Sequence, residues 1–378
     1  MVETGTFPGP EENLLPSANS YEVLAAKNAT LRLRAPSGHV FSFTDLTCAA
    51  GAVNFGHLNP AIDPYPMLAS DVAADFYPPS ADAFSKWLCR KLELEFHSVH
   101  YEVGSGVAAS IAMGQRRKPG KILVVEGSAH AGMRALDGRV RSITPGSECR
   151  DWSDVSCLIY EPIQAASGYV PLALPWLRGL SQQAQAAGVL VTADETQCGF
   201  YRFGKLSLAA NEFLRPDVFL FGNSMTNGIY PLAAVVYPDA FSEDMAAIKA
   251  DGSSPFQAST LGFQAAEAVA GYIDSTDIEG QVAQIYGVLS KVGERLAANP
   301  GLSDFHLGGP TLSFEVRDRR AEELALACRA RGVLMAASAD GRRVMIAPPL
   351  TISMDQLNTA MGVLEQAMGL LQMHGKSA

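Results

Sequence analysis

Val191-Thr-Ala-Asp-Glu-Thr-Gln-Cys-Gly-Phe200 is the stretch that decides the fold, because it carries an acid to the end of an apolar run. The run ends at Asp194, and an amide, Gln197, follows just before a glycine turn. A second apolar run, Val218-Phe-Leu-Phe-Gly222, leads into Asn223-Ser-Met-Thr-Asn-Gly228. Strand ends that carry a buried acid and polar side chains build ligand sites in parallel α/β sheets. The two segments therefore predict strands whose ends form a binding site.

The rest of the chain predicts an α/β domain followed by a smaller α+β lobe. Apolar strands that alternate with amphipathic helices imply a mainly parallel sheet covered on both faces. In that region the strand candidates are 99–103, 121–126, 155–160, 188–193, 217–222 and 232–237, with helices over 107–117 and 174–187. In the lobe we expect one or two helices over 263–298, strands over 311–316, 333–337 and 343–347, and helices near 320–331 and 354–372.

Three parts are predicted along the chain. Residues 1–50 form an arm (1–18) and a hairpin, in which Leu31-Arg-Leu-Arg34 and Val40-Phe-Ser-Phe43 flank a Pro-Ser-Gly turn. Residues 51–265 form the large domain. Residues 266–378 form the small domain, against which the N-terminal part packs.

Composition limits the class of protein. The 378 residues are 48% hydrophobic and 18% charged, as in a globular chain with a large core. A net charge of −10 argues against a nucleic-acid partner. No apolar run approaches the roughly 20 residues that span a bilayer, and the N-terminus lacks a signal-peptide pattern, so we expect a cytoplasmic protein without a membrane partner. The six cysteines show no Cys-x-x-Cys pair, which predicts reduced thiols and no metal site.

The two opening segments resemble those of the class III aminotransferases, fold-type I enzymes that use pyridoxal 5′-phosphate (PLP). In that family the acid binds the pyridinium nitrogen, and the next strand ends in Gly-Lys, whose lysine forms a Schiff base with PLP. The position of that lysine holds Asn223. The resemblance implies a fold-type I α/β architecture: a large domain with a mainly parallel sheet, plus a smaller α+β lobe.

Further motifs extend the resemblance from about Tyr21 to the end of the chain. One such match would be weak, but several in the same order are strong. Phe55-Gly-His-Leu-Asn-Pro60 looks like the family's Gly-His-x-x-Pro segment, and Glu161-Pro-Ile-Gln164 looks like its Glu-Pro-hydrophobic-Gln segment. Arg202-Phe-Gly-Lys205 and Pro348-Pro-Leu-Thr-Ile-Ser353 fit as well.

A cofactor site follows from these positions. Gly104, Ser105 and Gly106 end a strand and open a helix, where free backbone N–H groups and the helix dipole bind phosphate. Asp194, at the end of a buried strand, needs a cation or several hydrogen bonds. A pyridinium nitrogen provides the cation, and the alternative is an ion pair with an arginine. The resemblance assigns Gln197 to the phenolic oxygen of the ring.

Three more residues are assigned to the cofactor by resemblance. Glu161 begins the Glu-Pro segment, and His130 aligns with the histidine of the family's aromatic-His-Gly segment, although the stacking aromatic is Ala129. A structural and a catalytic role for His130 both stay open. Thr260 corresponds to the threonine that reaches a phosphate in the other subunit, which implies a homodimer with its active site at the interface. The alternative role of Thr260 is a helix N-cap.

The missing lysine leaves three interpretations. In the first, Asn223 is an engineered substitution that traps a normal enzyme. In the second, the chain binds PLP or the pyridoxamine form (PMP) noncovalently, with His130 as the candidate acid or base, as in some sugar dehydratases. In the third, the fold has lost pyridoxal chemistry and serves as a binding protein or a cofactor-free enzyme. An asparagine amide is neither nucleophilic nor basic, so it replaces none of the lysine's functions.

Other departures argue against a single engineered change. Val107 replaces a glutamate, and Met345 stands where the family often places an arginine for the substrate carboxylate. Arg343 lies on the same strand face and is a partial substitute. We therefore predict a class III aminotransferase-like protein that binds PLP or PMP and acts on a small molecule such as an amino sugar or a specialised metabolite. Asn223 puts standard transamination in question, and a dehydratase- or isomerase-like reaction remains the alternative.

Overall fold

The structure is a computed structural model that describes residues 21–62, 78–130, 138–251 and 259–374. The predicted N-terminal arm lies outside these residues. The chain divides into two compact units, one made of residues 1–60 and 277–378 and the other of residues 61–276. The three-part division predicted from the sequence, with boundaries near 50 and 265, stays a prediction. Within the described residues, no helix is long and apolar enough to cross a membrane.

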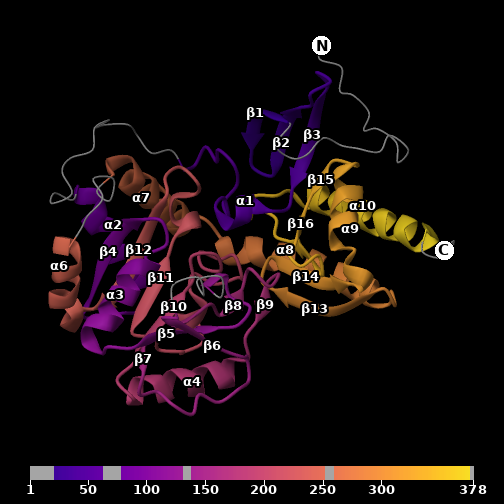
Figure 1. The fold of residues 1–378 in the computed structure, drawn as a ribbon. Helices are drawn as coiled ribbons and strands as arrows, with labels where there is room; N and C mark the ends of the chain where they lie inside the picture. Colours follow the sequence, from indigo (N-terminus) through magenta and orange to yellow (C-terminus); the bar gives the residue numbers. More distant parts are fainter. Residues whose placement is uncertain (1–20, 63–77, 131–137, 252–258, 375–378) are drawn as a thin grey trace. The chain divides into compact units, whose positions relative to one another are not determined.

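A seven-stranded sheet organises the unit of residues 61–276 (Figure 1). Its order is β4 (His97–Val103), β12 (Leu232–Pro238), β11 (Val218–Phe221), β10 (Leu190–Asp194), β7 (Val155–Tyr160), β5 (Lys121–Val125) and β6 (Val140–Ile143). Only β12 runs antiparallel to its neighbours in this sheet. Every residue of β7, β10 and β11 is buried, as expected of parallel strands covered on both faces. The predicted α/β fold is confirmed.

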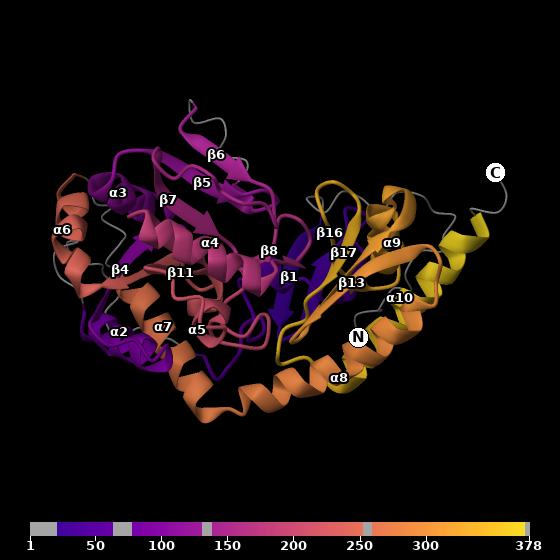
Figure 2. The same cartoon turned by 90° about the horizontal axis from the view of Figure 1, so that it is seen from below.

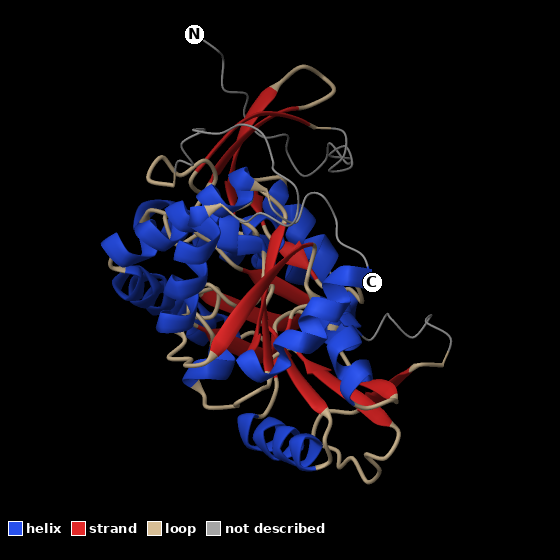
Figure 3. Cartoon of the chain, turned by 90° about the vertical axis from the view of Figure 1, so that its left-hand side faces the viewer, coloured by secondary structure: helices blue, strands red, loops and turns tan. Residues whose placement is uncertain are grey.

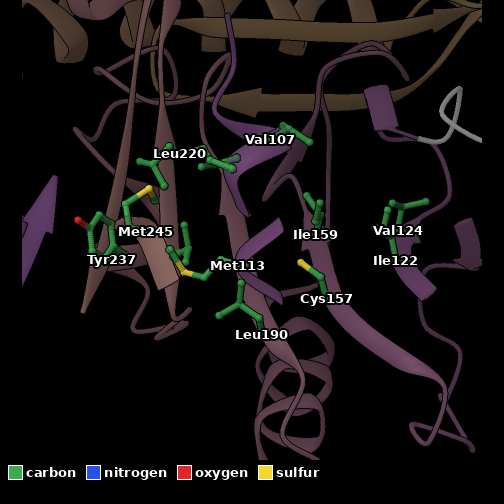
Figure 4. Packing of buried hydrophobic residues seen from close by; sticks show 13 residues of the cluster. Val107, Met113, Ile122, Val124, Cys157, Ile159, Leu190, Leu220, Tyr237 and Met245 are labelled. Atoms are coloured by element: carbon green, nitrogen blue, oxygen red, sulfur yellow. The ribbon is translucent and has the colours of Figure 1, made fainter. Parts of the chain in front are cut away.

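One face of this sheet is covered by α3 (Val107–Arg117) and α6 (Ser242–Asp251), which pack against each other. Figure 4 shows the buried side chains of α3, α6 and five strands that form the core on this face. Along β4 the side chains alternate, so Tyr101 points to the other face. There its ring contacts Phe84 of α2 (Pro79–Lys91) and Phe263 of α7 (Thr260–Ser275). Figure 3 shows strands in red among the blue helices.

Two smaller helices and a hairpin complete this unit. The helix α4 (Leu174–Ala186) packs against β10, and the single turn α5 (Leu208–Asn211) follows the glycine turn at Gly199. The strands β8 (Ile163–Gln164) and β9 (Val170–Pro171) pair after β7.

The other unit joins the two ends of the chain. Its first sheet has the order β1 (Glu22–Lys27), β2 (Thr30–Arg34), β3 (Val40–Asp45) and β15 (Val333–Leu334). Its second sheet has the order β13 (Leu302–Gly308), β14 (Thr311–Val316), β17 (Arg343–Ile346) and β16 (Ala336–Ala337). The long helix α8 (Ile278–Ala297) packs against β13, and α10 (Met354–His374) packs against α8 and α9 (Ala321–Arg329) (Figure 2).

The predicted strand over 333–337 is wrong in one respect. It is two short strands in different sheets, because β15 pairs with β3 while β16 pairs with β17. The chain changes sheets at the buried Met335. A continuous apolar pattern predicts a strand, but it does not reveal that its two halves have different partners.

Candidate functional site

The ends of β10 and β11 bring the opening segments of the sequence together. Asp194 lies beside Leu220 in parallel register, and the Glu195 N–H donates to the Leu220 carbonyl at 2.9 Å. A Cβ atom built on Gly222 would lie 3.3 Å from Thr196 Cγ2, so the backbone there runs close to the turn after Asp194. The acid and the position of the missing lysine, directly after Gly222, therefore share one edge of the sheet.

Asp194 is 3% exposed and its carboxylate is hydrogen-bonded by protein groups. One oxygen accepts from the backbone N–H of Thr196 at 2.8 Å and from its hydroxyl at 2.6 Å. The other lies 2.7 Å from Nε2 of His130, which is 8% exposed. In the part of the chain that the structure describes, the ion-pair partner of Asp194 is this imidazole and not an arginine. Each carboxylate oxygen has two lone pairs, so the oxygen facing His130 has room for one more donor.

Glu161, at the end of β7, completes a buried cluster of titratable groups. Its carboxylate is 3% exposed and accepts from the Ala129 N–H at 3.1 Å. Burial, and then the charge of Asp194, raise the pKa of Glu161 to about 7. For His130, burial lowers the pKa, but the hydrogen bond to Asp194 and the charges of Asp194 and Glu161 outweigh it, so the pKa is raised. The two carboxylates therefore favour the cationic form of the imidazole.

The segment of Gly104, Ser105 and Gly106 forms an open helix N-terminus. Gly106 is the N-cap of α3 and has no side chain to cap the first turn. The Ser110 N–H reaches the Gly106 carbonyl at 3.2 Å, so the N–H groups of the turn before it are free to bind an anion. Gly104 and Ser105 are exposed at this end. A side chain at Gly106 would meet Val235 Cγ2 at 2.6 Å, which explains the glycine.

Gln197 and Thr260 belong to two different segments of this unit. Gln197 is half-buried in the turn after Asp194. Thr260 is the first residue of α7 and is 5% exposed. The N-cap of α7 is Ser259, whose hydroxyl accepts from the Gly262 N–H at 3.3 Å, so the predicted N-cap role of Thr260 is wrong. The contact of Thr260 with a second subunit stays a prediction.

Asn223 is exposed and opens the 3-10 turn Asn223–Thr226. Its φ of 43° lies in the left-handed region, which asparagine tolerates better than most residues. The helix α7 packs against this turn. An exposed amide at this point can exchange hydrogen bonds with a ligand, and it offers neither a nucleophile nor a base.

Arg343, the predicted partial substitute for the missing carboxylate-binding arginine, is already paired with other side chains. Its guanidinium is buried within its own unit, where Nη1 lies 2.5 Å from Asp304 Oδ2 and Nη2 donates to Ser313 Oγ at 3.3 Å. These contacts tie β17 to β13 and β14. The half-buried Met345 on the same strand carries no charge.

The residues present fit PLP or PMP. A cavity of about 500 Å³, within the range of small-molecule pockets, is lined by both Ser105 and His130. The rest of its lining comes mainly from α3, between Val107 and Gln115, with Ile122 and Arg139, and Asp194, Gln197 and Asn223 do not line it. The fit to the cofactor therefore rests on the open helix N-terminus for a phosphate and on the buried carboxylate of Asp194 for a ring nitrogen.

Comparison with known proteins identifies the family of this chain. The family model of the class III aminotransferases matches residues 139–368, and the chain belongs to this family. Class III aminotransferases are PLP-dependent transferases that use PLP or PMP.

Among its relatives, rat mitochondrial ornithine aminotransferase is 26% identical over 216 residues, which cover 56% of this chain and 48% of that protein. The acetylornithine aminotransferase of Lactococcus lactis is 26% identical over 212 residues, covering 56% and 55%. The chain thus spans about half the length of the curated relatives it matches.

Solved structures share the fold. The acetylornithine aminotransferase of Elizabethkingia anophelis superposes with a TM-score of 0.76 at 21% identity, covering 95% of both chains. A Bacillus anthracis aminotransferase gives a TM-score of 0.81 at 19% identity, covering 94% of this chain and 95% of that one. At such identities the likeness shows the fold alone.

Proposed function

We propose that this chain binds PLP or PMP noncovalently at the ends of β10 and β11 and acts there on a small-molecule substrate. The observation that carries the proposal is the buried carboxylate of Asp194, which lies at the strand end of a family that uses this cofactor. A bound PLP supplies an electron-withdrawing pyridine ring. Asp194 would face the ring nitrogen, the N–H groups after Gly106 would hold the phosphate with Ser105, and Gln197 would donate to the phenolic oxygen.

Asn223 determines that the cofactor is not covalently held. Its amide orients a ligand through hydrogen bonds at the position where the family has a lysine. Standard transamination relies on a base at that position, and we infer that this chain has lost it. A PMP-dependent reaction, in which the cofactor already carries the amino group, is compatible with Asn223.

The substrate we propose is an amino sugar or another specialised metabolite that is not bound mainly through an α-carboxylate. Two observations support this: Met345 is uncharged, and the guanidinium of Arg343 is bound by Asp304 and Ser313. The named relatives act on ornithine and acetylornithine, so these two are the comparison substrates. We also propose a cytoplasmic homodimer.

Two alternatives remain. A dehydratase- or isomerase-like reaction with His130 as acid or base is less well supported, because Nε2 of His130 is bound to Asp194 and the ring is buried. A binding protein without cofactor is favoured by one observation, since His130 and Thr196 already satisfy Asp194 without any ligand. Cofactor binding therefore decides between the proposals.

The test is calorimetric titration of PLP and PMP into the wild-type protein and the Asp194→Ala variant. Loss of one charged hydrogen bond costs about 1.5–3 kcal/mol, so we expect Asp194→Ala to weaken binding roughly 10- to 100-fold. Asp217→Asn is the matched control, because Asp217 accepts from the Val191 N–H at the opposite end of β10. Equal, millimolar binding by the wild-type protein and Asp194→Ala would reject the cofactor proposal.

A further inference from the structure

Three strands of the large sheet bring two carboxylates to one imidazole. Asp194 ends β10, Glu161 follows β7, and His130 follows β5 after a short turn. All three side chains are at least nine-tenths buried. His130 contacts Asp194 directly, and Glu161 holds the backbone of Ala129, next to His130, at 3.1 Å. In the region that the structure describes, β7, β5 and β10 are adjacent, which places these groups side by side.

The net charge of this cluster determines how strongly it attracts a protonated ring nitrogen. A cationic His130 and an ionised Asp194 cancel, so the pair alone is electrically neutral. A buried neutral pair gives little net attraction for a protonated ring nitrogen. Glu161 is the carboxylate that leaves the cluster with one net negative charge when it is ionised.

Among the residues that the structure describes, the other charged groups near the cluster do not take over this role. Glu195 is buried beside Asp194 in sequence, but its carboxylate is bound by the Leu208 N–H at 2.6 Å and the Ala209 N–H at 3.1 Å at the start of α5. Arg139 lines the same cavity as His130, and it is exposed. Burial, and then the charges of Glu195, Glu161 and Asp194, raise the pKa of the Cys198 thiol, so it stays neutral.

We propose that Glu161 is a positioning residue that, together with Asp194, holds His130 as a cation and supplies the net negative charge that the ring nitrogen of the cofactor meets. The part that concerns the ring nitrogen rests on the proposed function. The part that concerns His130 is a property of the protein without cofactor. A purely structural role, in contrast, would be limited to the hydrogen bonds that its carboxylate accepts from the backbone N–H groups of Ala129 and Ala165.

The test follows the imidazole of His130 by NMR in the cofactor-free protein. The chain has 7 histidines, and the resonance that disappears in His130→Asn identifies the relevant one. Glu161→Gln keeps an oxygen that accepts from the Ala129 N–H and removes the charge. We expect it to lower the titration midpoint of His130 by roughly 0.5–1 pH unit, as expected for the loss of a nearby opposite charge.

Glu126→Gln is the matched control. Glu126 lies four residues before His130, and its carboxylate accepts from the hydroxyls of Ser142 and Thr144. We expect it to leave the His130 midpoint unchanged. An unchanged midpoint in a folded Glu161→Gln protein would overturn the proposal and leave Glu161 only its hydrogen bonds with the backbone of Ala129 and Ala165.

A reciprocal measurement covers the case in which Glu161→Gln does not fold. Two coupled titratable groups shift each other's pKa, so His130→Asn should raise the titration midpoint of the Glu161 carboxyl group, measured by the chemical shift of its carboxyl carbon. An unchanged Glu161 midpoint there would reject the coupling equally well.

PMP binding then tests the ring-nitrogen part separately. We expect Glu161→Gln to weaken PMP binding roughly 3- to 10-fold at pH 8, where Glu161 is ionised, and to match the wild-type protein at pH 5.5. Equal affinities at both pH values would reject this part. Failure of the wild-type protein to bind PMP would instead reject the proposed function, while the His130 titration still decides the rest.

Discussion

At the scale of single residues, the contact between Asp194 and His130 is not by itself a sign of catalysis. The same arrangement occurs in the other unit, where Asp45 accepts from the Thr47 N–H at 2.8 Å and the Thr47 hydroxyl at 2.6 Å. The second oxygen of Asp45 lies 2.8 Å from Nε2 of His57. An Asp-x-Thr turn whose aspartate also contacts a histidine thus occurs twice in the described part of the chain, and it stabilises the local backbone in both places. Asp194 is distinguished by Glu161 and by its place at the strand ends.

Asn223 leads to the first residue-scale prediction. Asn223→Lys restores an amine at the exposed start of the turn, so we expect PLP to become covalently attached. The adduct is measured by mass spectrometry after borohydride reduction. Lysine is less tolerant of the left-handed backbone than asparagine, and we expect a loss of about 0.5–1 kcal/mol in stability. Asn223→Arg is the control, because it adds a cation without a nucleophile. Absence of an adduct in Asn223→Lys, with PLP bound, would contradict the expected geometry.

Glu161 leads to a prediction about pH. Its pKa is raised on folding from 4.5 to about 7, so its contribution to stability is present at low pH and is lost as the pH rises through 7. We expect wild-type protein to lose more unfolding free energy between pH 5 and pH 8 than Glu161→Gln, by on the order of 2 kcal/mol. Urea unfolding at both pH values measures this difference. A larger loss in the variant would show that the sign is wrong.

At the scale of secondary structure, the sequence predicts strands and helices best where apolar residues are continuous or clearly periodic. The predicted ranges 107–117, 155–160 and 311–316 coincide with α3, β7 and β14. Among the segments without a predicted range are β1, β6, β13 and α2. The strand β6 has only one fully buried residue, so it carries no strong period.

For the candidate site, the sequence predicts the place of single residues better than their neighbours in space. It predicts Asp194 at the end of an apolar strand, and β10 ends there. The cluster of His130, Glu161 and Asp194 was not predictable, because it depends on β5, β7 and β10 being neighbours in the sheet. Strand order is set by side-chain packing between distant segments, which a local pattern does not encode. The ion pair between Arg343 and Asp304 is unpredictable from the sequence for the same reason.

The start of α3 gives a prediction at this scale. Gly106 has a φ of 73°, and a Cβ atom there would meet Val235 Cγ2 at 2.6 Å. We expect Gly106→Ala to destabilise the protein by about 1–3 kcal/mol and to weaken PMP binding, because the helix N-terminus must shift. Gly179→Ala on α4 is the control, since no atom lies within 4 Å of its added Cβ, and we expect it to be neutral or slightly stabilising. Equal stability of the two variants would show that α3 accommodates the methyl group.

At the scale of the whole molecule, the family match crosses from one unit into the other. It runs over residues 139–368, whereas the units divide near residues 60 and 276. The N-terminal strands belong to the same unit as the C-terminal lobe, because β3 pairs with β15. Folding of that unit therefore requires both ends of the chain, and loss of either end should expose an edge of the first sheet.

The final prediction concerns assembly. If each site takes Thr260 from a second subunit, a mixed dimer of Asp194→Ala and Thr260→Val chains has one site with both defects and one site with neither. We therefore expect each variant alone to bind PMP weakly, and an equimolar mixture, refolded together, to regain tight binding at about a quarter of the chains' sites. Calorimetry gives the stoichiometry, and light scattering gives the mass of the assembly. Thr260 is 5% exposed at the start of α7, which packs against the turn Asn223–Thr226 of its own chain. A role of Thr260 confined to its own subunit predicts a different result. In that case each mixed dimer has two defective sites, and the mixture shows no tight binding.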